Sequence, residues 1–302
     1  MSSPPSPASS TRSSGSGAAP SASKSPTSPS PPSAAGARPD PAAAVWPAAR
    51  RCLDAALTLL FAPPCATCDG PLDHPSASAV CAACWTAVAR WTPPWCACCG
   101  QPQSPWRPAA DVCPRCRRIS GALPVRVVGP YEGRLRDVLH AFKYDGRRSL
   151  APALAGLLRA QATDVLAAAD LVVPVPLHRA RRRARGFNQA HDLAARLGPP
   201  VIAALRRVRA TAAQTALTAP ARRRNVRGAF ALAPAGYGRG RWSTTARQRA
   251  TIDAIAGRVV VLVDDVITTG ATLDACAAVL RTAGAADVRA VTVARAVIGR
   301  PR

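Results

Sequence analysis

The chain has 302 residues and a formal net charge of +24, and 48% of its residues are apolar. This length suggests about two domains of roughly 150 residues each, and the charge predicts a polyanionic partner such as nucleic acid or a phosphorylated metabolite. We see no apolar run of about 18 residues and no basic patch followed by an apolar block near the start. These patterns argue against a membrane span and a secretory signal, so we expect a cytoplasmic protein.

Residues 1–44 consist almost entirely of Ser, Pro, Ala and Gly. Such a segment has too little apolar surface to offset its ordering entropy, so we expect a disordered tail; a misassigned start codon is the alternative. Between residues 45 and 61, apolar side chains recur at the spacing of a short amphipathic helix. Pro63 and Pro64 end this helix.

Eight cysteines between residues 65 and 116 form four CxxC pairs. A CxxC turn places two sulfurs on one side of a knuckle, and two knuckles supply four thiolates for a tetrahedral Zn2+. The spacing predicts two structural zinc sites, the first from Cys65, Cys68, Cys81 and Cys84, the second from Cys96, Cys99, Cys113 and Cys116. The alternatives are an interleaved pairing, in which the first and third pairs share a metal, and a redox-active thiol cluster.

Three cysteines lie outside the four CxxC pairs, and four tryptophans lie within residues 65–116. We expect Cys98 to be a spare thiol and Cys52 and Cys276 to be core residues, because the last two lie in helical patterns. Packing within a small zinc fold is the expected role of the tryptophans, and stacking on bases is the alternative; these residues are Trp85, Trp91, Trp95 and Trp106.

After Gly121, strand and helix patterns alternate. We expect strands near 125–129, 170–175, 258–264 and 288–296, and helices near 133–143, 149–168, 187–197 and 271–283. The run 258–264 is continuously apolar, which is typical of a strand buried on both faces. Residues 204–229 are Arg-rich and polar, and residues 236–256 are expected to be a loop or lid. The alternation predicts an α/β fold with a parallel sheet.

The segment 259–272 ends a buried strand with two adjacent acids, Asp264 and Asp265. Carboxyl ends of parallel strands face a ligand crevice, and the following loop and helix N-terminus form an anion site. The acids can accept hydrogen bonds from vicinal hydroxyls, directly or through Mg2+, so the segment fits a ribose 5-phosphate. The candidate phosphate ligands are Thr268, Thr269, Gly270, Ala271 and Thr272.

This segment resembles the phosphoribosyl pyrophosphate (PRPP) motif of type I phosphoribosyltransferases. Residues 45–302 resemble the ComF family, competence-associated bacterial proteins that join a double zinc ribbon to a phosphoribosyltransferase domain. The shared landmarks are the four Cys pairs and the runs 142–144 (FKY), 174–177 (PVPL), 185–190 (RGFNQA) and 222–230 (RRRNVRGAF). The resemblance implies a type I phosphoribosyltransferase-like parallel sheet flanked by helices in residues 121–302, after a helix and double zinc ribbon in residues 45–120. Residues 236–256 look like an insertion.

Five arginines follow the strand expected at 171–175, where they would face pyrophosphate: Arg179, Arg181, Arg182, Arg183 and Arg185. The resemblance makes the turn after Val175 the pyrophosphate loop and places Arg222, Arg223, Arg224 and Arg227 in a flexible loop that closes over the site. Arg179, Arg185 and Arg223 are our candidate PRPP ligands. A solvated basic face and a nucleic-acid groove are the alternatives. Asn188 and Gln189 either read a base or cap a helix.

The resemblance implies transfer of phosphoribose from PRPP, bound with Mg2+, to a nitrogen acceptor with release of pyrophosphate. Asp264 and Asp265 would favour cationic character at the anomeric carbon, and the arginines would stabilise the leaving group. We see no general base with a defined partner. The alternative, implied by the family's association with competence, is a non-catalytic DNA-uptake protein that binds single-stranded DNA or a helicase partner. A zinc-ribbon transcription regulator is a weaker alternative.

Overall fold

A computed structural model describes residues 49, 52–56, 63–72, 74–106, 112–117, 123–209, 226–234 and 244–296. The chain divides into two units, Met1–Val45 and Trp46–Arg302. The tail expected at residues 1–44 lies outside the described residues, and so do residues 222–225 of the run 222–230. The description below therefore concerns the second unit.

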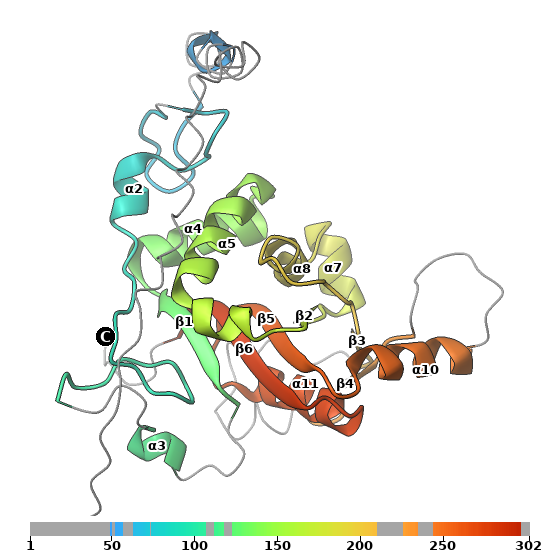
Figure 1. Ribbon diagram of the computed structural model, residues 1–302. Coiled ribbons are helices and arrows are strands. Elements are labelled where there is room, and N and C mark those ends of the chain that lie inside the picture. The colour runs from blue at the N-terminus through green and yellow to red at the C-terminus, as the bar shows by residue number, and fades with distance from the viewer. Residues whose placement is uncertain are drawn as a thin grey trace, which may run out of the picture. The chain divides into compact units, whose positions relative to one another are not determined.

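Four parallel strands form the main sheet in the order β1-β6-β5-β2 (Figure 1). They are β1 (Val125–Pro130), β2 (Leu171–Pro174), β5 (Val259–Ile267) and β6 (Asp287–Arg295). Strand β5 pairs with β2 on one side, where Val261 lies opposite Val172, and with β6 on the other, where Leu262 lies opposite Ala290. The predicted α/β fold with a parallel sheet is confirmed.

Alternation along β5 buries both faces of the sheet. Val261 and Val263 pack into a core with α4 (Gly133–Tyr144), α5 (Ala151–Gln161) and α8 (Gln189–Ala194). Val260 and Leu262 pack into a second core with α11 (Ala271–Thr282). Figure 1 shows the first three helices on one side of the sheet and α11 on the other. Side chains leaving the end of β5 can therefore reach either helical layer.

The helix expected at 149–168 is interrupted. The structure has a 3-10 turn at Arg148–Leu150 (η1), then α5, then α6 (Thr163–Ala167). The break falls at Ala162, which is fully buried and whose backbone no longer has a helical conformation. The apolar spacing continues across the break, so periodicity alone did not show it. The helix expected at 187–197 is shorter, because α8 ends at Ala194.

Three elements lie in segments where the sequence predicted no helix or strand. Within the expected pyrophosphate loop, Arg179–Arg185 form a helix, α7. A ring nitrogen of His178 accepts a hydrogen bond from the Ala180 amide at its start. The Arg-rich segment 204–229 begins with β3 (Leu205–Arg207), which pairs antiparallel with β4 (Phe230–Leu232).

The third element is α10 (Thr244–Ile255), in the segment predicted to be a loop or lid. Ile255 is fully buried, and the hydroxyl of Thr251 donates a hydrogen bond to the Ala233 carbonyl over 2.8 Å. The glycines and arginines of residues 236–243, outside the described part, obscured the helix-forming Ala, Arg and Gln that follow.

The two cysteine modules join the sheet domain differently. In the first, which contains α2 (Ala82–Thr86), Val80 and Val88 belong to the same core as Leu135 of α4. The second, which contains α3 (Pro114–Arg117), has its own small cysteine cluster. It meets β1 through the backbone, where the Val125 amide donates to the Cys98 carbonyl over 2.7 Å.

Glycine is required at this second contact. Gly100 has a φ of +67°, and a Cβ at this position would lie 2.6 Å from the Val125 carbonyl oxygen. Only a residue without a Cβ adopts this backbone conformation easily and also lets the two chains approach so closely.

Candidate functional site

Two groups of four cysteines come together within the described residues. The sulfurs of each group all lie within 4.8 Å of one another; the groups are Cys65, Cys68, Cys81 and Cys84, and Cys96, Cys99, Cys113 and Cys116. A Zn–S bond of about 2.3 Å implies sulfurs about 3.8 Å apart in a tetrahedron. The distances from Cys68 to Cys81 and from Cys99 to Cys113 are 3.8 and 3.9 Å. Both groups therefore fit zinc, in the sequential arrangement.

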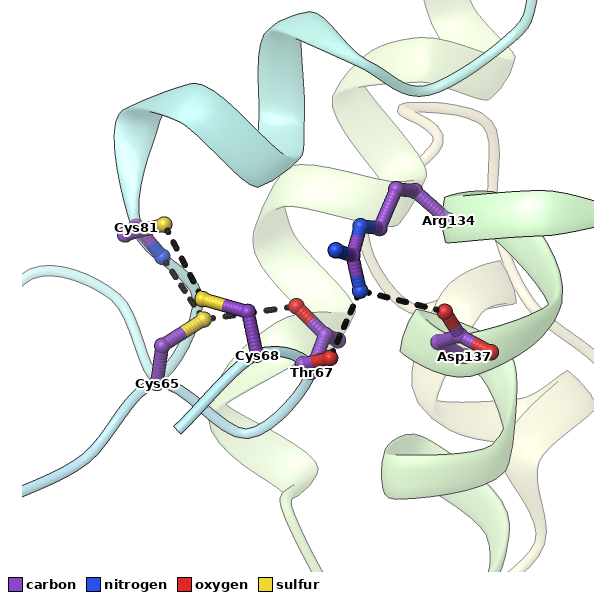
Figure 2. A network of polar contacts seen from close by, with 6 residues as sticks. All are labelled: Cys65, Thr67, Cys68, Cys81, Arg134 and Asp137. Atoms are coloured by element: carbon purple, nitrogen blue, oxygen red, sulfur yellow. Dashed lines mark hydrogen bonds and ion pairs between the residues drawn. The ribbon is translucent and has the colours of Figure 1, made fainter. Parts of the chain in front are cut away.

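Backbone and side-chain donors support the thiolate form of Cys65 in the first group. The Cys81 amide donates to the Cys65 sulfur over 3.3 Å, and the Thr67 hydroxyl lies 3.3 Å from the same sulfur (Figure 2). Burial raises the pKa of the Cys65 thiol, but these hydrogen bonds outweigh burial and lower the pKa to about 6. Hydrogen bonds to a charged group favour that form, which is the form that binds metal.

The remaining cysteines only partly follow the sequence prediction. Cys276 is fully buried, and Cys98 belongs to neither group, both as expected. Cys52 was expected in the core but is exposed. The helical pattern alone could not show which face of this segment would be covered.

Three tryptophans contact the protein itself. The Trp85 indole donates to the Ser78 hydroxyl, Trp91 packs against the α11-side core, and Trp95 lies 5.6 Å from the Arg126 guanidinium. Trp106 differs, because it is 94% exposed.

The adjacent acids lie near the carboxyl end of β5 and face opposite layers. Asp265 points to the α4 layer, where one carboxylate oxygen lies 3.1 Å from the Lys143 ammonium; both side chains are almost buried. Asp264 follows Val260 and Leu262 on the α11 side, where its charge acts on Arg207 of β3 and on Cys276. The Asp265 amide donates to an Asp264 carboxylate oxygen over 2.9 Å. The pair therefore straddles the sheet edge.

The electrostatics of this edge are strongly perturbed. Burial, followed by the charge of Asp265, raises the pKa of Asp264 to about 7, although Lys143 and Arg207 act in the opposite direction. Burial, followed by the charge of Arg181, lowers the pKa of Arg207. Charged groups from β5, α4, β3 and α7 thus influence one another here. Titratable groups perturbed by burial together with specific charges are typical of functional sites.

The expected phosphate ligands form the link from β5 to α11. Gly270 has a φ of +86° at the N-cap of α11 and, as a glycine, offers no capping side chain of its own. The Thr269 hydroxyl accepts a long hydrogen bond of 3.4 Å from the Ala271 amide. Thr268 and Thr272 are both partly exposed. The N-terminus of a helix attracts anions through its backbone amides and its dipole.

The arginines of α7 point in different directions. Arg179 is exposed and lines an open hollow of about 440 Å³ with Arg182, Arg183 and Gly186. Arg181 is half-buried, and its charge acts on Arg207. The Asp264 edge is therefore linked electrostatically to Arg181. Arg223 lies outside the described residues.

Arg185 ties α7 to α4 and α8. Its guanidinium donates to the Gln189 side-chain oxygen and to the Tyr144 hydroxyl, each over 3.2 Å, and stacks 4.9 Å from the Tyr144 ring centre. Asn188 caps α8 by accepting from the Ala190 amide, and its NH2 group donates to the Val175 carbonyl. The capping alternative for Asn188 thus describes its observed contact.

Sequence reasoning assigned no role to Lys143 or Arg207. The run 142–144, which contains Lys143, was used only as a landmark of the family. Arg207 was one of many arginines in a polar segment. One available signal was composition, because the chain has 38 Arg and only 2 Lys.

Comparison with known proteins agrees with this architecture. The model of the double zinc ribbon domain matches residues 56–117, and that of the phosphoribosyl transferase domain matches residues 184–301. Competence protein F of Haemophilus influenzae is 30% identical over 243 residues, which are 77% of this chain and 96% of that protein. The chain belongs to the ComF family.

Other similarities extend over less of this ComF-family chain. DNA utilization protein YhgH of Escherichia coli K12 is 34% identical over 172 residues, 54% of this chain and 67% of that protein. A hypoxanthine phosphoribosyltransferase structure from Staphylococcus aureus has a TM-score of 0.26 and 16% identity, covering 48% of this chain and 62% of that chain. Among the described residues of the ComF-family protein, no helix is long and apolar enough to cross a bilayer.

Proposed function

We propose that the protein binds PRPP at the carboxyl edge of β5 and transfers its phosphoribosyl group to a nitrogen acceptor. The observation that carries this proposal is the acid pair followed by a helix N-terminus that begins at a glycine, inside the segment that the phosphoribosyl transferase model matches. We place this reaction in the cytoplasm, where thiolates remain reduced.

Each part of the ligand has a group of matching chemistry nearby. The 5-phosphate would bind the amides and hydroxyls of residues 268–272, and the ribose would lie across Asp264 and Asp265. Their negative charge would stabilise the cationic anomeric carbon that forms as pyrophosphate departs. Arg181 and Arg185 are the half-buried arginines of α7, and we assign them to the pyrophosphate side. Arg223 remains a candidate from the sequence.

The two kinds of metal have different roles in this proposal. Zinc in the cysteine groups is structural, because protein thiolates supply all four ligands of each site. Mg2+ would enter with the pyrophosphate group, whose charge it neutralises.

Calorimetry with PRPP and Mg2+ tests the proposal. Asp264→Asn combined with Asp265→Asn should abolish detectable PRPP binding, because a neutral amide pair cannot supply the same anionic acceptors. Asp253→Asn is the matched control, since Asp253 is exposed on α10. Unchanged affinity in the double variant would refute the site. Pyrophosphate release, screened across nucleobases, then separates turnover from binding alone.

A second candidate function is binding of single-stranded DNA without catalysis. Exposed Arg179, Arg182 and Arg183 surround one open hollow, and the names of the relatives refer to competence and DNA utilization. Phosphate contacts by arginine give an affinity that falls steeply with salt. A DNA titration against salt, with and without PRPP, distinguishes the functions: a steep slope that PRPP leaves unchanged favours the DNA role.

A further inference from the structure

Lys143 is an unusual cation for this chain. It is one of two lysines among 40 basic residues, and the other, Lys24, belongs to the N-terminal tail. Lys143 is nearly buried at the C-terminal end of α4, with 9% of its surface exposed. A buried ammonium is costly unless it is paired. The identity of its partner therefore indicates its role.

The partner is an acid of the proposed sugar site. The Lys143 ammonium lies 3.1 Å from an Asp265 carboxylate oxygen and 5.6 Å from the centre of the Tyr131 ring. Lys143 also acts on Asp264, whose pKa it lowers. One side chain from α4 therefore influences both acids at the end of β5. The matched phosphoribosyl transferase segment, residues 184–301, does not include α4.

The acid pair has protein cations on both sides of the sheet. Two carboxylates face Lys143 from α4 and Arg207 from β3. Arg181 of α7 adds positive charge near Arg207, while Cys276 of α11 is a buried thiol whose pKa lies well above its usual value, so it adds no charge. A divalent cation on Asp265 would have to approach an ammonium already in contact with that carboxylate. Oxygen ligands suit Mg2+, but this pair already has its cations.

We propose that Lys143 is the fixed counter-cation of the acid pair and favours the charged state that accepts the sugar hydroxyls, so that the pentose subsite needs no divalent cation. This inference rests on the proposed PRPP site and leaves Mg2+ to the pyrophosphate group alone. Lys143 is a positioning residue here, because it acts through the carboxylates. This role therefore predicts effects of metal and pH on ligand binding that a purely structural lysine would not produce.

Ribose 5-phosphate is the appropriate probe, because it carries the pentose and phosphate but no pyrophosphate to bind Mg2+. Calorimetry on the zinc-loaded protein would compare the wild type with Lys143→Met in Mg2+-free buffer without chelator and in Mg2+. We expect wild-type affinities that agree within about twofold in the two buffers. Lys143→Met should bind at least about tenfold more weakly at pH 7 in the Mg2+-free buffer and recover as the pH rises to about 9, where the acids ionise unaided. Lys143→Arg, which keeps the charge, should retain more affinity than Lys143→Met.

Thermal unfolding without ligand gives a second readout that does not depend on binding. When the pKa of an acid is raised on folding, the folded protein loses stability as the pH rises from the acid's pKa in the unfolded chain to its pKa in the folded protein. For Asp264 this window runs from about 4 to about 7 in the wild type, and removal of Lys143 should extend it upward. The Tm difference between Lys143→Met and wild type should therefore widen from pH 5 to pH 9. Adding Asp265→Asn should reduce this widening.

The outcomes separate this inference from the proposed function. If neither ribose 5-phosphate nor PRPP binds the wild type, both proposals fail. If ribose 5-phosphate binds only with Mg2+, or Lys143→Met binds it as the wild type does, the role of Lys143 is refuted while the PRPP site stands. A Tm difference that is constant across pH also refutes this role, even where the variant binds no ligand.

Discussion

At the scale of single residues, Asp264 has the environment expected of a functional acid. Its side chain follows the buried run Val260–Val263 of β5 and lies next to a second acid, and burial, followed by the charge of Asp265, raises its pKa to about 7. Structural carboxylates are usually stabilised in their charged form. The surroundings of Asp264 instead allow its protonation near neutral pH. A small change in the charges nearby would then shift Asp264 between its protonated form and the ionised form that accepts hydrogen bonds.

The affinity for ribose 5-phosphate should therefore depend on pH. With a pKa of about 7, the ionised fraction of Asp264 falls about tenfold from pH 8 to pH 6. Because the ionised carboxylate accepts the sugar hydroxyls, we expect the affinity to fall by about the same factor. Calorimetry at intermediate pH values measures the midpoint.

The phosphate of the ligand also titrates, near pH 6, so a control is needed. Asp264→Asn removes the protein group and leaves the ligand unchanged. Equal pH profiles for the variant and the wild type would show that Asp264 does not govern binding.

At the scale of elements, α4 connects the first zinc module to the acid pair. Near its N-terminal end, Arg134 donates to the Thr67 carbonyl over 2.7 Å, inside the Cys65–Cys68 knuckle (Figure 2). At its C-terminal end, Lys143 pairs with Asp265. Leu135, Leu139 and Phe142 are fully buried between these ends. The position of the ammonium thus depends on how α4 is held.

Arg134→Ala should lower the free energy of unfolding by about 1 kcal/mol, the usual net value of one hydrogen bond. We expect this small loss of stability because the Arg134 side chain remains partly exposed. Urea unfolding of the zinc-loaded protein measures the change. Arg136→Ala is the control, because Arg136 is exposed on the same helix. Equal losses in both variants would contradict a specific role for the contact with the zinc knuckle.

At the scale of the whole molecule, the two zinc modules contribute differently to one structural unit. The first shares a core with α4, α5 and the sheet, whereas the second has a separate cluster and contacts β1 through its backbone. Loss of the first metal should therefore disturb the domain that carries the proposed site. Loss of the second should remain more local.

Cys84→Ser and Cys116→Ser compare the modules directly, because both cysteines are buried members of their groups. We expect each variant to lose about one of two zinc ions per chain, as measured by elemental analysis. The Tm should fall further for Cys84→Ser, because α2 is packed into the large core. An equal or larger fall for Cys116→Ser would contradict this difference between the modules.

Much of this protein could be predicted from its sequence, because the relevant signals are local. The spacing of the CxxC pairs indicated both zinc groups, since each knuckle is built within a few residues. The apolar run ending at Asp264 indicated a buried strand and a ligand edge, because the end of a parallel strand faces a crevice. Family landmarks added the transferase fold.

Only the tertiary structure decided what surrounds these elements. The pairing of Lys143 with Asp265, the approach of Arg207 to Asp264 and the helical form of Arg179–Arg185 depend on contacts between segments far apart in the chain. Alternation along β5 sent the adjacent acids to opposite layers, and packing determined which cation each one met. Local spacing carries no information about such partners, because burial and charge balance are set when the layers pack together.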